Sequence, residues 1–243
     1  MTQKETILIT GGTSLVGRAV IPRLITDGYN VVFTSRRSES KIEGAKCIGV
    51  DLLHDDGVAS LLSALDKEHI TINHIIHNFR DIDNLKTDEY AMPTQEQWLR
   101  EYQAAVSVPA SITATLANSN SLRSVINITS IYGIVSANLQ LYEGDQRAAP
   151  IHYNVAKAAQ IHLTKELSVR LAPKSIRVNA VAYGGIKGRA DDNFENRYDN
   201  LCPLDGMLNA EDLSGAISFL LSEKDSAKIT GQTLQVDGGW TLW

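Results

Sequence analysis

Short apolar runs alternate with longer amphipathic stretches along this chain. Six runs rich in β-branched residues have the length of buried parallel strands: 6–10, 30–35, 47–50, 72–77, 123–129 and 175–182. Helical spacing of apolar residues marks the other stretches, at about 15–27, 56–67, 95–118, 150–171 and 211–221. Strands that alternate with helices in this way predict an α/β fold with a parallel sheet.

Composition narrows the class of protein. The 243 residues are 43% hydrophobic and 21% charged, which fits a single domain over residues 1–243. A net charge of −5 and no basic run beyond Arg36–Arg37 argue against nucleic acid as a partner. Two distant cysteines and six histidines without paired spacing predict neither a disulfide framework nor a metal site. No stretch has the pattern of a signal peptide or a membrane span, so we expect a cytoplasmic protein that does not bind membranes.

Three residues around the fifth strand and the following helix form a set suited to proton transfer. Tyr153 and Lys157 lie four residues apart, so a helix projects both from one face. A lysine ammonium one turn away favours the phenolate form of a tyrosine and so eases proton transfer at neutral pH. Ser130 directly follows the strand at 123–129, where it can donate a hydrogen bond to a substrate oxygen. We predict that these three residues act together on a carbonyl/alcohol pair.

A glycine-containing turn lies between the first strand and the first helix. Such a turn points free backbone N–H groups and the positive end of the helix at an anion, typically a pyrophosphate. We predict that a dinucleotide contacts this segment: Thr10, Gly11, Gly12, Thr13, Ser14, Leu15, Val16 and Gly17.

The end of the second strand bears on the choice of cofactor. An acidic residue there would bind the adenosine ribose diol and favour NAD. This chain has Ser35, Arg36 and Arg37 instead, and two guanidinium groups suit the 2′-phosphate of NADP(H). We therefore favour NADP(H), with NAD(H) as the alternative if the arginines belong to a solvated loop.

These motifs together resemble the short-chain dehydrogenase/reductase family over the entire chain. The resemblance rests on the strand-end Ser130, on Tyr153-x-x-x-Lys157, on the run at 175–182 and on the DGG turn at 237–239. It implies a Rossmann-type, doubly wound parallel sheet of seven strands in a three-layer sandwich with helices on both faces. It also implies a homo-oligomer, a tetramer or a dimer, that transfers hydride between NAD(P) and a secondary alcohol/ketone pair of a small molecule.

The resemblance also implies roles for individual residues. Tyr153 would be the acid/base, Ser130 would orient the carbonyl oxygen, and Lys157 would assist Tyr153 and hold the nicotinamide ribose. Further cofactor contacts are implied at five positions: Asp51, Leu52, Asn78, Gly184 and Ile186.

Several positions depart from the family pattern. Leu15 replaces the middle glycine of the turn, or Ser14 does when the longer form of the family turn is compared. Phe79–Arg80 replaces an Ala-Gly pair, and Tyr183 and Gly188 replace a proline and a threonine of the family. Ala105 stands where the family has an asparagine that holds a water of the proton relay, so the relay is absent, rerouted, or supplied by a neighbour such as Gln103 or Ser107. These departures keep an alternative open, namely a non-catalytic nucleotide-binding or regulatory protein on the same fold.

An insertion before the predicted catalytic helix bears on the substrate. The segment 137–152, ANLQLYEGDQRAAPIH, is polar and longer than the usual loop of the family. It indicates a small polar, sugar-like substrate, although a surface insertion or a subunit contact is an equal alternative. We predict substrate contacts at four residues: Arg80, Tyr142, Glu143 and Tyr183. For Arg80, a side chain that points to solvent is the alternative. Short runs in this region also resemble oxidoreductases of flagellin-modification and nonulosonic-sugar pathways.

Overall fold

Seven strands form one parallel sheet, which confirms the predicted fold class. The computed structural model describes residues 4–188, 190–204 and 206–243. The strands are β1 (Thr6–Thr10), β2 (Asn30–Ser35), β3 (Ala45–Gly49), β4 (His74–His77), β5 (Ser124–Ser130), β6 (Arg177–Tyr183) and β7 (Thr233–Val236). Their order in the sheet is β3-β2-β1-β4-β5-β6-β7.

The order in which the chain adds strands to the sheet reverses next to β1. From there β2 and β3 extend to one side, and β4 to β7 extend to the other. All neighbouring strands are parallel, so their carboxyl ends share one edge. Doubly wound sheets bind their ligands at this edge, next to the point where the strand order reverses.

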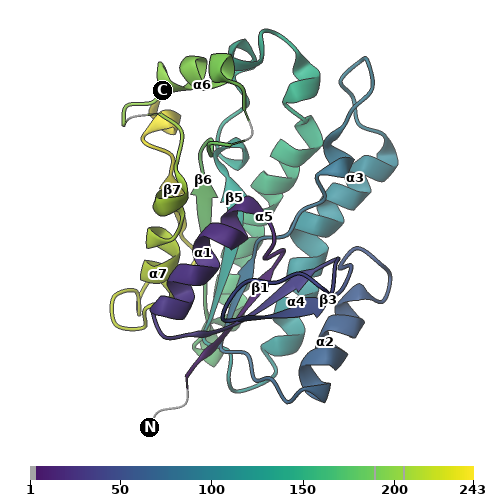
Figure 1. Cartoon of the computed structure of the whole chain (residues 1–243), viewed down its shortest axis with the longest axis vertical. Coiled ribbons are helices and arrows are strands. Elements are labelled where there is room, and N and C mark those ends of the chain that lie inside the picture. Colours follow the sequence, from purple (N-terminus) through teal and green to yellow (C-terminus); the bar gives the residue numbers. More distant parts are fainter. Residues whose placement is uncertain (1–3, 189, 205) are drawn as a thin grey trace.

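Helices cover both faces of the sheet. They are α1 (Leu15–Thr26), α2 (Gly57–Lys67), α3 (Gln95–Tyr102), α4 (Val108–Leu116), α5 (Ile151–Leu171), α6 (Asp192–Asp199) and α7 (Gly215–Leu221). Ile7 and Ile9 of β1 pack with α1 and α7, whereas Leu8 between them packs with α2, α4 and α5. Successive strand residues point to opposite faces, so one strand contributes to two cores. Figure 1 shows the two groups of helices on either side of the sheet.

The longest predicted helix is interrupted. The stretch predicted as one helix over 95–118 consists of α3, a π-helical segment over Gln103–Ser107, and α4. A π turn is wider than an α turn, so it changes the direction of the side chains that follow it. Ala105, in the middle of this turn, packs against Ala156 of α5. None of the described helices is both long and apolar enough to cross a membrane.

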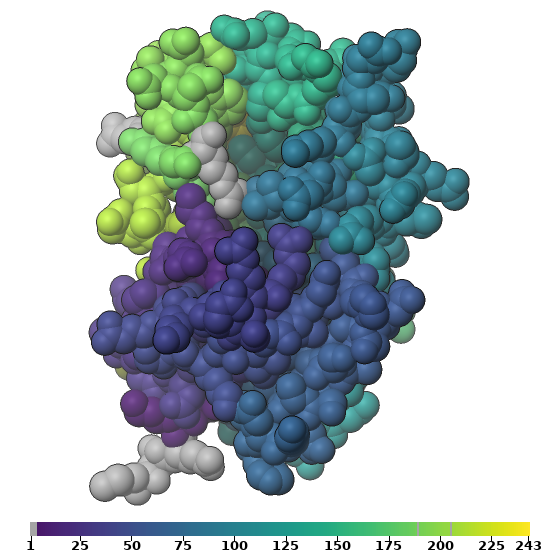
Figure 2. Space-filling model, turned by 45° about the vertical axis from the view of Figure 1, so that its right-hand side comes forward, coloured from purple at the N-terminus to yellow at the C-terminus, as the bar shows by residue number. Residues whose placement is uncertain are grey.

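Helix α6 and several short turns lie above the carboxyl edge of the sheet (Figure 1). Tyr198 of α6 packs with Leu141, Met207 and Trp240 in a small separate core. The polar sequence of the stretch 189–203 predicts a mobile lid over the substrate. Arg189 lies outside the described residues, and the rest of the stretch contains α6 with its own packing. The mobility of the lid stays a prediction. In Figure 2 the surface is hollowed between the purple N-terminal part and the teal and green segments above it.

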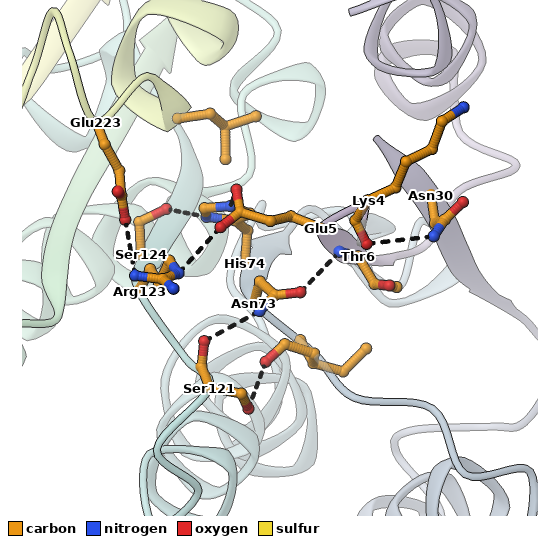
Figure 3. A network of polar contacts seen from close by, with 12 residues as sticks. Lys4, Glu5, Thr6, Asn30, Asn73, His74, Ser121, Arg123, Ser124 and Glu223 are labelled. Carbon is orange, nitrogen blue, oxygen red and sulfur yellow. Dashed lines mark hydrogen bonds and ion pairs between the residues drawn. The ribbon is translucent and has the colours of Figure 1, made fainter. Parts of the chain in front are cut away.

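At the amino edge of the sheet, polar side chains pair with one another (Figure 3). We call this set the amino-edge network: Glu5, Asn73, His74, Arg123, Ser124 and Glu223. Buried His74 places Nδ1 2.8 Å from Ser124 Oγ and Nε2 3.1 Å from Glu5 Oε2. Arg123 forms ion pairs with Glu5 at 2.9 Å and with Glu223 at 3.3 Å. The network therefore joins the start of β1 to β4, β5 and the segment after α7.

Candidate active site

Ser130, Tyr153 and Lys157 line one cavity at the carboxyl edge of the sheet, the catalytic cavity. Ser130 is the last residue of β5, and the other two residues lie one turn apart on α5. Helix α5 comes close to this strand end because Gly133 has no side chain: a Cβ there would lie 2.7 Å from the Lys157 carbonyl carbon. Thr129 Oγ1 also donates to Lys157 O over 3.2 Å. The fold thus brings together the three residues predicted to act jointly.

The Lys157 ammonium is buried and held by two acceptors. Its Nζ donates to Ile128 O over 2.9 Å and to Gln160 Oε1 over 2.8 Å. Burial lowers the pKa of Lys157 to about 8, because the charged form loses hydration. The Glu101 carboxylate opposes this shift, and the Arg80 guanidinium adds to it. The charge of Lys157 near neutral pH therefore depends on these two neighbours.

The hydroxyls of Ser130 and Tyr153 are available to a ligand. Both residues border the catalytic cavity and a neighbouring one, the substrate cavity. Ser130 Oγ accepts from Tyr132 N over 3.2 Å, which leaves its proton for another acceptor. The Lys157 ammonium lies 5.7 Å from the Tyr153 ring centroid, and the Arg80 guanidinium carbon lies 5.5 Å from it. Neither hydroxyl donates to a protein acceptor among residues 4–188, 190–204 and 206–243.

A third cavity, the cofactor cavity, adjoins the catalytic cavity, and both are bordered by Ser14 and Arg80. Seven predicted cofactor residues border it: Gly11, Thr13, Ser14, Ser35, Arg36, Asp51 and Leu52. Other predicted cofactor residues border the catalytic cavity: Val16, Asn78, Tyr153, Lys157, Gly184 and Ile186. The remaining predicted contacts border neither of these two cavities: Thr10, Gly12, Leu15, Gly17 and Arg37.

Several of these remaining residues stabilise the conformation of the turn without facing either cavity. A Cβ at Gly17 would lie 2.4 Å from Gly12 O, so only glycine allows this close approach. Thr10 Oγ1 accepts from Asn78 N over 3.0 Å. Ser14 Oγ caps α1 by accepting from Gly17 N, and it accepts from Asn78 Nδ2 over 2.8 Å. Side-chain hydrogen bonds therefore fix the turn and the helix start together.

Leu15 does not disrupt the turn, although it replaces a family glycine. It is the first residue of α1, and its side chain packs against the core shared by α1 and α7. Gly11 has a φ of +67°, and a Cβ there would lie 2.6 Å from Phe79 Cα. Some N–H groups of this segment already donate to protein acceptors, namely those of Gly11, Gly12, Ser14 and Gly17. Those of Thr13 and of the first two residues of α1 have no acceptor among the described residues and are left for a ligand. These residues fit the pyrophosphate of a dinucleotide.

The substrate cavity extends from Ser130 and Tyr153 towards α6. Its walls include four aromatic side chains: Tyr132, Tyr142, Phe194 and Tyr198. The Tyr142 hydroxyl lies 2.6 Å from the Tyr132 hydroxyl, and its ring centroid lies 5.1 Å from that of Phe194. Burial raises the pKa of Tyr132 and of Tyr142, so both remain neutral phenols. Tyr142 therefore borders the same cavity as Ser130 and Tyr153, and its contact with a substrate stays a prediction.

Two other predicted substrate contacts, Glu143 and Tyr183, do not border the substrate cavity. Glu143 is 75% exposed and pairs with Arg197 at 3.0 Å, outside the substrate cavity. Tyr183 borders the catalytic cavity, but its hydroxyl donates to Leu213 O and its ring belongs to the core under α1. A polar loop does not reveal which of its side chains turn inward, and the Tyr183 side chain leaves β6 on the core side. Arg80, by contrast, borders all three cavities.

Glu101, which the sequence reasoning missed, borders none of the three cavities but lies close enough to influence the pKa of Lys157. Its side chain is 1% exposed, and Asn84 Nδ2 donates to its Oε2 over 3.4 Å. Burial raises the pKa of Glu101, while Lys157 and the Asn84 hydrogen bond are the largest opposing influences. Gln103 and Ser107, the relay substitutes considered from the sequence, border none of the three cavities. The available signal was an acidic residue three positions after Trp98, on the apolar side of the helix pattern.

Comparison with known proteins agrees with this geometry. The family model described as enoyl-(acyl carrier protein) reductase matches residues 13–241. The human dehydrogenase/reductase SDR family member 4 is 29% identical over 248 residues, which cover 96% of this chain and 86% of that protein. The post-translational flagellin modification protein A of Campylobacter coli is 41% identical over 118 residues. That alignment covers 49% of this chain and 46% of the relative.

A solved structure extends the likeness to nearly the whole chain. A short chain dehydrogenase from Leptospira borgpetersenii serovar Hardjo-bovis (strain JB197), with bound NAD+, superposes with a TM-score of 0.86 at 26% identity. The match covers 98% of this chain and 93% of the other.

Proposed function

Because the chain belongs to the short-chain dehydrogenase/reductase family and is an NAD(P)-dependent oxidoreductase of CH–OH groups, we propose that it interconverts a secondary alcohol and a ketone on a small, sugar-like substrate. One observation carries the proposal. Ser130, Tyr153 and Lys157 border the same cavity, and that cavity lies between the cofactor cavity and an aromatic-walled substrate cavity.

Each of the three residues has a distinct task. In the reducing direction the Tyr153 phenol gives its proton to the ketone oxygen, and in the oxidising direction the phenolate takes it back. The Ser130 hydroxyl donates to the same oxygen and polarises the carbonyl. The buried Lys157 ammonium stabilises the phenolate from within the same helix. A nicotinamide dinucleotide, when bound, supplies or accepts the hydride.

Glu101 acts on this set through Lys157. Its buried carboxylate favours the ammonium form of Lys157, against the effects of burial and of Arg80. It is therefore a positioning residue, one helical turn before Ala105, where the family has the relay asparagine. In this proposal the buried Glu101 carboxylate, by keeping Lys157 charged, offsets part of the loss of the asparagine side chain at position 105.

For the cofactor we propose NADP(H), with NAD(H) as the second candidate. Arg36 borders the cofactor cavity beside Ser35, and no acidic residue occupies the end of β2. Arg37 is exposed and lies away from that cavity, so one guanidinium rather than two supports the 2′-phosphate. The bound NAD+ of the Leptospira relative favours the second candidate.

A sugar-like substrate is supported by the walls of the substrate cavity. Tyr142 and Phe194 present faces against which the C–H groups of a sugar ring can pack, and Ser130 and Tyr153 offer hydroxyls. The likeness to a flagellin modification protein points in the same direction. We further propose a single domain over residues 1–243, a cytoplasmic location and a homo-oligomer, either tetramer or dimer.

A non-catalytic nucleotide-binding protein remains the alternative, because Leu15, Phe79–Arg80 and Ala105 all depart from the family pattern. A binding protein would have no use for two free hydroxyls and a buried ammonium in one cavity. We expect a secondary alcohol of a sugar panel to reduce the cofactor with the wild type but not with Tyr153→Phe.

The first experiment is a calorimetric titration of the wild type with NADPH and with NADH. We expect NADPH to bind about 10-fold or more tightly than NADH, and Arg36→Ala to remove that preference while Arg37→Ala largely keeps it. Tighter NADH binding would reverse the cofactor assignment but leave the enzyme standing. Binding of neither nucleotide would reject the proposed function.

A further inference from the structure

Arg80 differs from the other partly buried arginines of the described chain. Arg100 pairs with Asp81 at 2.6 Å, Arg197 pairs with Glu143, and Arg177 donates to Ser226 Oγ and to backbone carbonyls. The guanidinium of Arg80 makes no hydrogen bond or ion pair with any residue in the ranges 4–188, 190–204 and 206–243. A guanidinium that is partly removed from water without a partner is unfavourable unless a ligand provides one.

The nearby carboxylates do not serve as that partner. Asp191 borders the substrate cavity, but its Oδ1 caps α6 by accepting from Phe194 N over 2.8 Å. Asp81 borders the cofactor cavity and is held by Arg100. Glu101 is close enough for Arg80 to lower its pKa, yet the two form no ion pair. Positive charge is therefore left open towards the cavities beside Tyr153.

Building on the proposed function, we propose that the substrate carries an anionic group, a carboxylate or a phosphate, and that the Arg80 guanidinium binds it. The guanidinium carbon lies 5.5 Å from the Tyr153 ring centroid, so an anion held there keeps the rest of the substrate within reach of the Tyr153 and Ser130 hydroxyls. The ring of such a substrate packs against the wall formed by Tyr142 and Phe194. The substrate class is then an acidic sugar, either a sugar acid or a sugar phosphate.

The position of Arg80 also favours the substrate over the cofactor as the source of the anion. The pyrophosphate has a separate site at the Gly11–Gly17 turn and the N-terminus of α1, which Ser14 caps. An anion at Arg80 has a catalytic benefit as well. Arg80 repels the Lys157 ammonium and lowers its pKa, so a bound anion that neutralises Arg80 helps to keep Lys157 charged.

Three sugars with the same ring test the proposal: glucose, glucuronate and glucose 6-phosphate. Each is titrated by calorimetry into protein saturated with NADPH, or with NADH if that binds better, because an alcohol is not turned over in this complex. We expect at least one anionic sugar to bind about 10-fold or more tightly than glucose. Preference for glucuronate identifies a carboxylate, and preference for glucose 6-phosphate identifies a phosphate.

The variants assign the preference to Arg80. Arg80→Gln should remove it, and Arg80→Lys should retain only part of it, because an ammonium lacks the two-pronged guanidinium geometry. Arg170→Gln is the matched control: it also removes one positive charge, but from a side chain that is 72% exposed and pairs with Glu166 outside the cavities. It should keep the full preference.

Three results would overturn the inference. The first is that the wild type binds the three sugars equally or not at all. The second is that Arg80→Gln keeps the preference for an anionic sugar. The third is that Arg80→Gln loses dinucleotide affinity, and that this loss accounts for the loss of sugar binding. The last result would place the cofactor pyrophosphate on Arg80. If the wild-type protein binds neither NADPH nor NADH, the proposed function itself is rejected. Failure of the Arg80 inference and failure of the proposed function are therefore distinguishable. Thermal unfolding of Arg80→Gln and Arg80→Lys checks that both variants are folded.

Discussion

The two edges of the sheet treat polar side chains in opposite ways. At the amino edge, His74, Arg123 and Glu5 are satisfied by one another and by their neighbours (Figure 3). At the carboxyl edge, Ser130 and Tyr153 leave their hydroxyl protons unused by the described residues. Because all neighbouring strands are parallel, their amino ends share one edge and their carboxyl ends the other, and a doubly wound strand order leaves room for ligands at the carboxyl edge.

The difference separates stability from activity. A buried polar group that is fully hydrogen-bonded holds segments together, and removing its partner is costly. A polar group left open at a cavity contributes little to folding and is available to a ligand. Changes at the amino edge should therefore alter unfolding with little effect on turnover, and changes at the carboxyl edge should do the reverse.

The largest effect is expected from Tyr153→Phe. It removes only the hydroxyl, so turnover should fall by about 1,000-fold while the free energy of unfolding changes by less than about 0.5 kcal/mol. Steady-state kinetics on an identified substrate and urea unfolding measure the two quantities. A large loss of unfolding free energy in Tyr153→Phe would contradict the proposed difference between the two edges.

At the amino edge, His74→Ala should have the opposite effect: it should lower stability and leave the dinucleotide site unchanged. It leaves a cavity and deprives Ser124 and Glu5 of a partner, so we expect a loss of about 2–4 kcal/mol in unfolding free energy. Dinucleotide affinity should be unchanged in the folded variant, as calorimetry would show. His162→Ala is the matched control, because that ring is 73% exposed and its removal should cost little. Altered dinucleotide affinity in His74→Ala would show that the edges are coupled.

A pH effect on stability should come from buried neutral histidines. Burial lowers the pKa of His77 to about 3 and also lowers that of His74. The unfolded chain then binds protons that the folded chain does not, so their contribution to stability is present above about pH 6.5 and is lost as the pH falls. For His77 this loss is about 2 kcal/mol between pH 7 and 5. Urea unfolding at both pH values should show it, and His77→Asn should show less. Equal acid sensitivity in the variant would contradict the assignment.

The smallest effect is expected from Glu101→Gln. Removing this charge lets the pKa of Lys157 fall below about 8, so Lys157 loses its proton at lower pH than in the wild type. The alkaline limb of the pH–kcat profile should move to lower pH, with a several-fold loss of kcat near pH 8. Glu101→Asp, which keeps the charge, should restore part of the profile. A loss of kcat that is uniform over pH would indicate that Glu101 acts on structure alone.

Local sequence was sufficient for most of the architecture. Predicted bounds for β1 and β2 are identical to the observed ones, and α5 begins one residue later than predicted. Prediction was poorer where packing decides the backbone, since the π turn at Gln103–Ser107 breaks a pattern that predicted one continuous helix. A single extra residue in a turn changes the apolar periodicity too little to be recognised.

The sequence by itself therefore determined the α/β order, the glycine turn, and the Ser130, Tyr153 and Lys157 set, because each depends on residues close together in the chain or on the end of a strand. Only the tertiary structure decided that Glu101 lies near Lys157, that Arg80 borders three cavities, and that Glu143 turns outward. The physical reason is that the direction and burial of a side chain depend on the packing of α3, α5 and the loops above the sheet. Those contacts join residues far apart in the sequence, and no local pattern records them.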